Sequence, residues 1–328
     1  MDQSVIINTS TIFDYVRPDL LKMEDLIRQQ MKESYVDLTN ALELLLSSGG
    51  KRVRPTITIL VGKCLKADYH RIITMAGSIE LLHTATLVHD DLIDGSLLRR
   101  GSPTLNSKWS AGATVLTGDY LFATAARLSS ETASIEALKL FSQTLQTIVN
   151  GEVRQMFSPR CLPGREEYYK RIYAKTASLF ETSAAVAGII SEAGKETVQA
   201  LSTFGREIGM AFQIADDILD FTGDESVMGK PKGSDLRQGL ITLPTQIFIE
   251  DNPHHPVVEK ITTSGCISES EDIKGFIQEI IDRNTIEKSY SIADEFIERG
   301  INALEILPNT IEKQMLISLV QSQARRNF

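Results

Sequence analysis

The chain has 328 residues, of which 42% are hydrophobic and 23% are charged, and this composition excludes the disordered and collagen-like classes. The length is sufficient for a large hydrophobic core. The formal net charge of -9 argues against a general nucleic-acid-binding protein, because such proteins bind through clustered lysines and arginines. No nucleic-acid partner is therefore expected, and an anionic ligand must be bound by local groups of cations.

Cysteine usage and the N-terminus suggest a location. Cys64, Cys161 and Cys266 lie far apart and are odd in number, so the sequence predicts neither a disulfide framework nor a zinc site. The chain start lacks a basic segment followed by an apolar one, and no run of about 18 apolar residues occurs. A cytoplasmic protein is expected, with transient membrane contact as a further expectation.

Apolar residues recur at steps of three and four residues through most of the chain, which predicts helices. The expected helices span residues 18–34, 37–48, 54–66, 70–92, 112–129, 134–156, 166–190, 196–221, 240–250, 270–282, 286–305 and 310–326. Gly49-Gly50 and Gly95 are predicted to end helices, and Asn309 with Glu312 forms a capping-box pattern that opens the last one. Because no alternating strand pattern is evident, a single all-α domain over residues 1–328 is predicted.

The first segment that suggests chemistry is Gly49-Gly50-Lys51-Arg52-Val53-Arg54-Pro55, which places three cations on a glycine-initiated turn before an apolar helix. Backbone amides and cations together can bind an anion. The alternative is a helix C-terminus followed by surface basic residues, and the segment taken alone favours that alternative.

The second segment is an aspartate cluster inside a strongly apolar predicted helix, where Asp90, Asp91 and Asp94 have the spacing DDxxD. Positions i and i+4 share one face of a helix, with i+1 beside them, so the three carboxylates point the same way. His83 lies two turns earlier and nearly in line with Asp90. Two like charges about 4 Å apart repel by roughly 4 kcal/mol at an effective dielectric near 20, so the cluster needs cations.

A second cluster, Asp216, Asp217 and Asp220, repeats this spacing and forms one polar stripe with Gln213 on another apolar helix. One cluster alone is equally compatible with a solvated helix face, but the second copy favours metal binding. Mg²⁺ typically uses one or two carboxylates and completes its shell with substrate phosphates. The two clusters therefore predict a Mg²⁺-bound diphosphate.

Two more basic loops follow the aspartate clusters. Arg99 and Arg100 come directly after the first cluster, and guanidinium groups favour bidentate binding of oxyanions. Lys230 and Lys232 follow the second cluster on a loop bounded by glycines. Together with residues 49–55, these loops predict binding of two separate diphosphates.

Four segments, in this order, resemble the trans-type polyprenyl diphosphate synthase family: residues 49–55, the first DDxxD with Arg99-Arg100-Gly101, Lys175-Thr176, and the stretch from Phe212 to Asp220. The resemblance covers roughly residues 40–245. It implies an isoprenoid-synthase-type helical bundle around a deep central cavity, and a prenyltransferase that ionises an allylic diphosphate. Isopentenyl diphosphate would attack the allylic cation and then lose a proton, with the released diphosphate as base.

The resemblance also implies roles for individual residues. About three Mg²⁺ ions per active site would be bound on the allylic diphosphate by Asp90, Asp91, Asp94, Asp216, Asp217 and Asp220. The same diphosphate would be bound by Arg99, Lys175 and Lys230, and isopentenyl diphosphate by Lys51, Arg54, His83 and Arg100. Lys175, Thr176 and Gln213 are the predicted catalytic residues. The side-chain oxygens of Thr176 and Gln213 would face the cationic carbon. The alternatives for these last two are a helix cap and a buried amide.

Two positions are not assigned a role by the resemblance. Many relatives carry Lys where Leu240 stands, so the allylic site would have one cation fewer, with Lys232 as the candidate substitute. His89, although adjacent to Asp90, is expected to be a packed core imidazole.

Product length is predicted from the residues about one turn before Asp90. Short-chain members of the family tend to carry bulky aromatics there, whereas this chain has Ala85 and Thr86. The resemblance therefore implies a long tunnel and a long-chain product of about C30 to C50. The alternatives are a shorter product of about C15 to C20 and the catalytic subunit of a heteromeric synthase; a homodimer is typical of the family.

Two other classes of protein fit the sequence less well. A terpene cyclase would not need residues 49–55, and it usually pairs one aspartate motif with an Asn/Ser/Glu motif. A non-enzymatic Ca²⁺ or Mg²⁺ scaffold of the EF-hand kind would carry a glycine-containing calcium loop, which is absent from the sequence.

Overall fold

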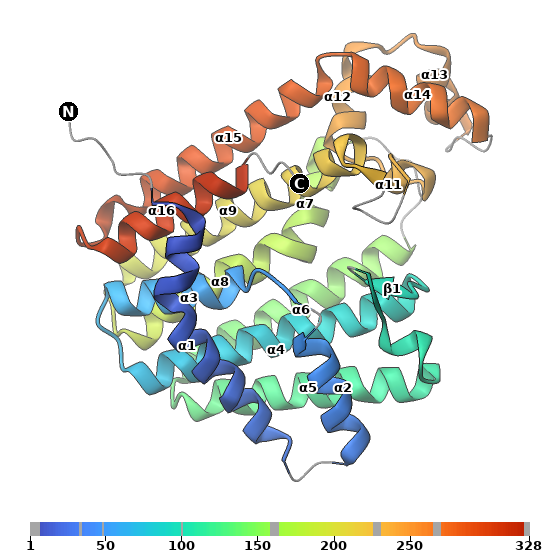
Figure 1. Cartoon of the computed structure of the whole chain (residues 1–328). Coiled ribbons are helices and arrows are strands. Elements are labelled where there is room, and N and C mark those ends of the chain that lie inside the picture. Colours follow the sequence, from blue (N-terminus) through green and yellow to red (C-terminus); the bar gives the residue numbers. More distant parts are fainter. Residues whose placement is uncertain are drawn as a thin grey trace. The chain divides into compact units, whose positions relative to one another are not determined.

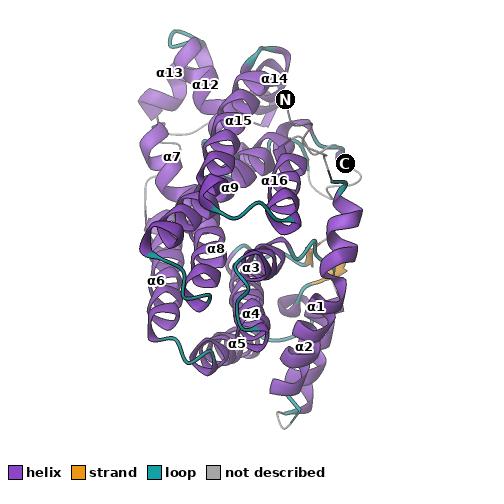
Figure 2. Cartoon of the chain, turned by 90° about the vertical axis from the view of Figure 1, so that its left-hand side faces the viewer, coloured by secondary structure: helices purple, strands orange, loops and turns teal. Residues whose placement is uncertain are grey.

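The structure is a computed structural model that describes residues 7–32, 35–47, 49–99, 101–157, 164–225, 231–264 and 270–324. Helices run through most of these residues (Figure 2). The described strands are β1 (Leu98–Arg99) and β2 (Ser102–Pro103), which pair antiparallel. The prediction of an all-α fold is confirmed, and so short a strand pair leaves no alternating pattern for the sequence to reveal.

The chain divides into two compact units. Unit 1 contains the first aspartate cluster and comprises Met1–Leu145, Leu179–Gly205 and Ala303–Leu319. Unit 2 contains the second aspartate cluster and comprises Gln146–Ser178, Arg206–Asn302 and Val320–Phe328. The single domain expected from the sequence stays a prediction.

Unit 1 is built around α4, which packs against α1, α3 and α5 (Figure 1). Every residue of α4 from 72 to 82 is buried, so apolar residues occur on every side of this stretch, and Glu80 is its one charged residue. The helices that begin in unit 1, with two short 3₁₀ turns, are α1 (Thr9–Gln30), α2 (Val36–Ser47), α3 (Val53–Cys64), α4 (Tyr69–Ile93), η1 (Leu105–Ser107), α5 (Ala111–Glu131), α6 (Ile135–Phe157), α9 (Lys195–Thr222), η3 (Leu304–Ile306) and α16 (Ile311–Ala324).

The two ends of the chain correct the sequence prediction. Helix α1 begins at Thr9 rather than at residue 18, because the Asn8 side chain accepts a hydrogen bond from the Ser10 amide and caps the helix. Pro18 is exposed and lies inside the helix. At the other end, the cap of α16 is Thr310 rather than Asn309, since the Thr310 hydroxyl accepts from the Lys313 amide at 3.3 Å.

Unit 2 has two apolar clusters, one of which packs α7 against α9, α12 and α15. The helices of this unit are α7 (Arg165–Ile172), the π-helical segment η2 (Tyr173–Ala177), α11 (Ser234–Arg237), α12 (Leu243–Asp251), α13 (Pro256–Ser264), α14 (Ser270–Asp282) and α15 (Thr285–Ala303). Helix α8 (Ser178–Ile190) follows η2 directly and lies mostly in unit 1. The predicted helix 166–190 is thus one continuous helical stretch with a π segment inside it, while α11 and α13 were not predicted.

The second apolar cluster of unit 2 joins the end of α9 to α11, α12, α13 and α14. Its centre is aromatic, since the rings of Phe248 and Phe276 meet edge to face with centroids 5.0 Å apart. Within the residues that the structure describes, no helix combines the length and the apolar character needed to cross a bilayer.

The aromatic centre of unit 2 yields a stability prediction. Phe248 is 0% exposed, so Phe248→Ala should leave a cavity and lower the free energy of unfolding by about 3–5 kcal/mol. Leu116→Ala is the control, because Leu116 is 68% exposed and its truncation should change stability by no more than about 0.5 kcal/mol. Urea denaturation followed by circular dichroism measures both, and equal effects would contradict the assigned core.

Candidate active site

The first aspartate cluster lies at the C-terminal end of α4. Asp90 is half-buried, Asp91 is buried and Asp94 is exposed at the helix C-cap. The Arg99 side chain, on β1, donates from Nε to both Asp91 oxygens at 2.9 and 3.0 Å, and its Nη2 lies 2.8 Å from Oδ1. The structure therefore brings Arg99 to Asp91 as a tight ion pair and leaves Asp90 and Asp94 as the more accessible carboxylates.

A close approach of α5 to α4 fixes the residue before this cluster. His89 lies 3.1 Å from the Val115 carbonyl oxygen through Nε2, and its ring meets Phe122 edge to face. A Cβ at Gly118 would lie 2.1 Å from that nitrogen, so glycine is what admits the imidazole. His89 is thus packed between α4 and α5, but its side chain is 23% exposed, so the expected core position is not confirmed.

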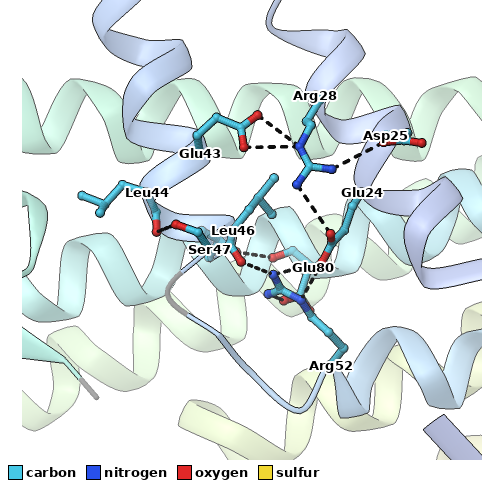
Figure 3. Close-up of polar contacts among 10 residues, drawn as sticks. Glu24, Asp25, Arg28, Glu43, Leu44, Leu46, Ser47, Arg52 and Glu80 are labelled. Carbon is cyan, nitrogen blue, oxygen red and sulfur yellow. Dashed lines mark hydrogen bonds and ion pairs between the residues drawn. The ribbon is translucent and has the colours of Figure 1, made fainter. Parts of the chain in front are cut away.

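The basic segment places its arginines in different surroundings. Arg54 Nη1 lies 3.1 Å from His83 Nε2, and the Arg54 guanidinium sits 4.5 Å from the centre of the Phe180 ring. Lys51 is exposed on the loop before α3. Arg52 instead pairs with Glu24 and Glu80 (Figure 3). The structure therefore brings Arg54 to His83, as the resemblance implied. Arg52, the middle cation of the segment, lies against carboxylates instead.

The positions expected to control product length are on α4, one turn before the aspartates. Ala85 is fully buried and Thr86 is half-buried. The Thr86 hydroxyl donates to the carbonyl oxygen of His83 at 2.7 Å. Thr86 is therefore the more accessible of the two, and a role in product length stays a prediction for both.

The second aspartate cluster, on α9, belongs to a chain of hydrogen bonds within unit 2. The Thr176 hydroxyl donates to Gln213 Oε1 at 2.6 Å, and Gln213 Nε2 donates to Asp217 Oδ1 at 2.8 Å. The Tyr168 hydroxyl donates to the other oxygen of Asp217 at 2.8 Å. Because each bond satisfies a donor with an acceptor, the chain fixes the orientation of the Gln213 amide.

Lys175 and Thr176 both lie in the π-helical segment η2, a conformation that often occurs at functional sites. Lys175 is exposed, and its Nζ lies 3.2 Å from Glu152 Oε1. Thr176 is buried. The π segment thus presents a cation and a hydroxyl at consecutive positions, one accessible and one inside.

The remaining aspartates of the stripe differ in burial. Asp216 is half-buried, whereas Asp220 is buried and its Oδ2 accepts a hydrogen bond from the Asp235 amide at 3.0 Å. Burial, and next the negative charge of Asp235, raise the pKa of Asp217 to about 7. The second cluster therefore has one carboxyl that favours its neutral form when no cation is near.

The loops that were predicted to supply further cations are described in part. Arg100 and Lys230 lie outside the described residues. Lys232 is half-buried, and its backbone amide donates to Glu225 at 2.9 Å. Leu240 is half-buried too. The assignment of Lys232 as a substitute cation stays a prediction.

Several contributing residues escaped the sequence analysis. Tyr168 and Glu152 contact predicted site residues, and Asn106 Nδ2 donates to the Asp91 carbonyl oxygen at 3.2 Å. Tyr168 lies seven residues before Lys175, two helical turns away, which is the one sequence signal for it. That spacing cannot reveal which carboxylate the hydroxyl reaches.

The donor chemistry fits a hard divalent cation, because both clusters supply carboxylate oxygens. Within the described part of the chain, no three His, Cys, Asp or Glu side chains converge closely enough to bind a metal by themselves. Mg²⁺ seldom needs such a cage, since it usually keeps water and phosphate oxygens as ligands. The residues therefore fit Mg²⁺ bound together with a diphosphate.

Comparison with known proteins places this arrangement in a family. A polyprenyl synthase from Caulobacter crescentus CB15, described as complexed with calcium and isoprenyl diphosphate, matches with a TM-score of 0.89 and 30% identity, covering 97% of this chain and 98% of that one. The fold is therefore the all-α isoprenoid-synthase fold, as predicted.

The sequence comparisons then define the family. Residues 36–280 match the family model described as "Polyprenyl synthetase". The chain is 34% identical to heptaprenyl diphosphate synthase component 2 of Geobacillus stearothermophilus, over 97% of this chain and 98% of that protein. It is 32% identical to octaprenyl diphosphate synthase of Escherichia coli (strain K12), over 98% and 99%. The chain belongs to the polyprenyl synthetase family, and the prediction of a prenyltransferase is confirmed.

The raised pKa of Asp217 predicts how stability depends on pH without divalent cations. A carboxyl with a higher pKa in the folded than in the unfolded state stabilises the fold fully below about pH 4, and this contribution declines and is lost as pH rises through about 7. With a chelator present, the free energy of unfolding of the wild type should fall over that range relative to Asp217→Asn. Parallel curves for the two proteins would contradict the assignment.

Proposed function

We propose that this chain is a long-chain trans-polyprenyl diphosphate synthase, which adds isopentenyl diphosphate repeatedly to an allylic diphosphate. The observation that carries the proposal is a match to the polyprenyl synthetase family over residues 36–280, which include one intact DDxxD motif at the C-terminal end of α4 and another on α9. The heptaprenyl and octaprenyl synthases among its relatives support a long product.

The isopentenyl diphosphate site is proposed to use Lys51, Arg54, His83 and Arg100. The contact between Arg54 and His83 supports part of this set, because it places a guanidinium and an imidazole within 3.1 Å. Arg54 also stacks on Phe180, which holds its planar fork in one orientation. A fixed fork favours bidentate binding of a phosphate.

The allylic diphosphate is proposed to bind Mg²⁺ held by Asp90, Asp91, Asp94, Asp216, Asp217 and Asp220. Asp90, Asp94 and Asp216 are the leading ligands, since they are the less buried members. When bound, Mg²⁺ supplies Lewis-acid stabilisation of the leaving diphosphate. The Caulobacter relative, whose structure contains calcium and isoprenyl diphosphate, supports a divalent cation here, and about three ions per site stay a proposal.

The protein's own groups would act on both fragments as the carbon–oxygen bond breaks. Arg99, Lys175 and Lys230 are proposed to bind the departing diphosphate. The Thr176 hydroxyl donates a hydrogen bond to Gln213 Oε1, so lone pairs of the Thr176 oxygen remain to face a carbocation. Dipoles that are already oriented cost little reorganisation during the reaction, and they lower the barrier in a site that excludes water.

Assembly and location are finer proposals. We favour a homodimer, which is typical of the family that the sequence resembles. The similarity to component 2 of a heptaprenyl synthase specifically favours a second candidate, the catalytic subunit of a heteromeric enzyme. Activity of the purified chain without any other protein distinguishes the two. A cytoplasmic location, with transient membrane contact during product release, is also proposed.

The proposed function is tested by incubating the purified chain with isopentenyl diphosphate, Mg²⁺ and allylic primers of about C5 to C20, and by measuring product length. We expect products of about C30 to C50 and no turnover in a chelator. Products that stop at about C15 to C20 would indicate a shorter-chain synthase.

The metal assignment predicts the effect of Asp90→Ala. Loss of one Mg²⁺ ligand should lower kcat by about 10³-fold, while fold stability should change little because a half-buried, repelling carboxylate is removed. The same should hold for Asp216→Ala. If both motifs serve one diphosphate, the double variant should lose less than the product of the two single effects. Independent, multiplicative losses would contradict a shared ligand.

The product-length assignment predicts that Ala85→Phe shortens the chain-length distribution. A bulky ring in place of a buried methyl group would fill the space that the growing prenyl chain is expected to occupy. Thr86→Phe, at the more accessible neighbouring position, should act in the same direction with a smaller cost in stability. Chromatography of the products measures both, and an unchanged distribution in both variants would refute the placement.

A further inference from the structure

Arg52 is the cation of the basic segment that no proposed substrate site uses. Its guanidinium Nη1 pairs with Glu80 of α4, and Nη2 lies 3.3 Å from Glu24 Oε1 of α1. The same Nη2 donates to the Leu46 carbonyl oxygen, near the end of α2, at 2.9 Å. Figure 3 shows these contacts converging on one side chain. Arg52 thus joins the loop before α3 to three other helices of unit 1.

The ion pair between Arg52 and Glu80 is largely buried. The Arg52 side chain is 13% exposed and that of Glu80 is 5% exposed. A charge taken out of water must be paired and hydrogen-bonded, so each group requires the other. The guanidinium is therefore committed to carboxylates and a carbonyl group, and it is not presented to a phosphate.

The backbone of Arg52 adds a second, independent observation. Arg52 is the residue before α3 and has φ 45° and ψ 38°, the left-handed conformation that residues other than glycine, asparagine and aspartate seldom adopt. Such a conformation persists when surrounding contacts over-determine it. The three side-chain contacts of Arg52 supply that constraint, and they set the direction in which the loop enters α3.

The residues on either side of Arg52 connect its contacts to the proposed substrate site. Lys51 and Arg54, which precede and follow within two positions, are the two cations of this segment in the proposed isopentenyl diphosphate site. Glu80 lies three residues before His83 on α4, so both ends of the ion pair are attached to elements that carry proposed ligands. The pair is therefore a direct link between the loop and the helix face that must act together.

We propose that Arg52 is a positioning residue. Through its buried ion pair with Glu80, it holds Lys51, Arg54 and His83 in the relative positions that bind isopentenyl diphosphate. This inference rests on the proposed function of that site. It assigns to the middle cation of the segment a role that differs from the roles of its two neighbours. It also predicts that the substrates respond differently, because no proposed allylic ligand lies on the loop that Arg52 anchors, and the aspartates at the end of α4 begin ten residues after Glu80.

The network offers a matched control. Arg28 belongs to the same charge cluster and contacts Glu43, Asp25 and Glu24, which joins α1 to α2 (Figure 3). Among the described residues, none of its ion pairs reaches residues 49–52. Its side chain is 36% exposed. Arg28→Met therefore removes an arginine from the network while leaving the link between the loop and α4 in place.

The experiment compares Arg52→Met, the double variant Arg52→Met with Glu80→Met, and Arg28→Met in the full chain. Met keeps the volume of the arginine stem, and replacing both members of a buried pair by apolar groups often preserves stability. Arg52→Met alone should lower Tm, and the double variant should recover it. Steady-state kinetics with each substrate varied in turn, together with thermal unfolding, give the readouts.

The expected result is a KM for isopentenyl diphosphate raised about tenfold in the double variant despite its recovered Tm, with the KM for the allylic substrate changed less than about twofold. Arg28→Met should leave both KM values unchanged. Recovery of the isopentenyl diphosphate KM together with Tm would overturn the inference, since the pair would then be structural alone. Equal increases of both KM values would overturn it as well.

The same measurements separate this inference from the proposed function. If the wild type does not consume isopentenyl diphosphate, the proposed function fails, and the inference fails with it. If the wild type is active and the double variant retains its KM values, the proposed function stands and only the positioning role of Arg52 is overturned.

Discussion

Each carboxylate that these helices bury must be held by a partner, and this constraint shapes the local structure around both aspartate clusters. Asp91 is held by the Arg99 guanidinium, and Asp217 by the Gln213 amide and the Tyr168 hydroxyl. A buried charge without such partners would cost far more than the fold can supply. The partners therefore decide where the neighbouring loop and helix turns must lie.

Those partners also divide the aspartates of each motif by their accessibility. Asp91 in the first cluster, and Asp217 and Asp220 in the second, are buried and bonded within the protein, while Asp90 and Asp216 keep part of their surface accessible. A hard cation that completes its shell with phosphate oxygens needs few protein ligands. The motif can therefore bind a metal through some members and use others to fix the geometry. Asp217, whose pKa is raised first by burial and next by the charge of Asp235, illustrates the electrostatic cost of burying a carboxylate when no cation is near.

The same division applies to the basic segment. Arg54 is oriented by stacking on Phe180 and lies against His83, whereas Arg52 is committed to Glu80. A planar guanidinium suits both tasks, because it can make several hydrogen bonds in fixed directions. Neighbouring residues of one motif thus have different surroundings. The π segment shows the same contrast, since Lys175 is exposed and Thr176 is buried.

The sequence by itself determined the helical class, most helix positions and the identity of the aspartate motifs, because periodicity and i, i+4 spacing are local properties of the chain. It could not determine that Arg52 turns to Glu80, 28 residues away, or that Tyr168 reaches Asp217 across 49 residues. It also placed the last helix cap at Asn309, where the structure has Thr310. Side-chain partners from distant segments are chosen by packing and burial, and a local pattern carries no information about either, so only the tertiary structure decided them.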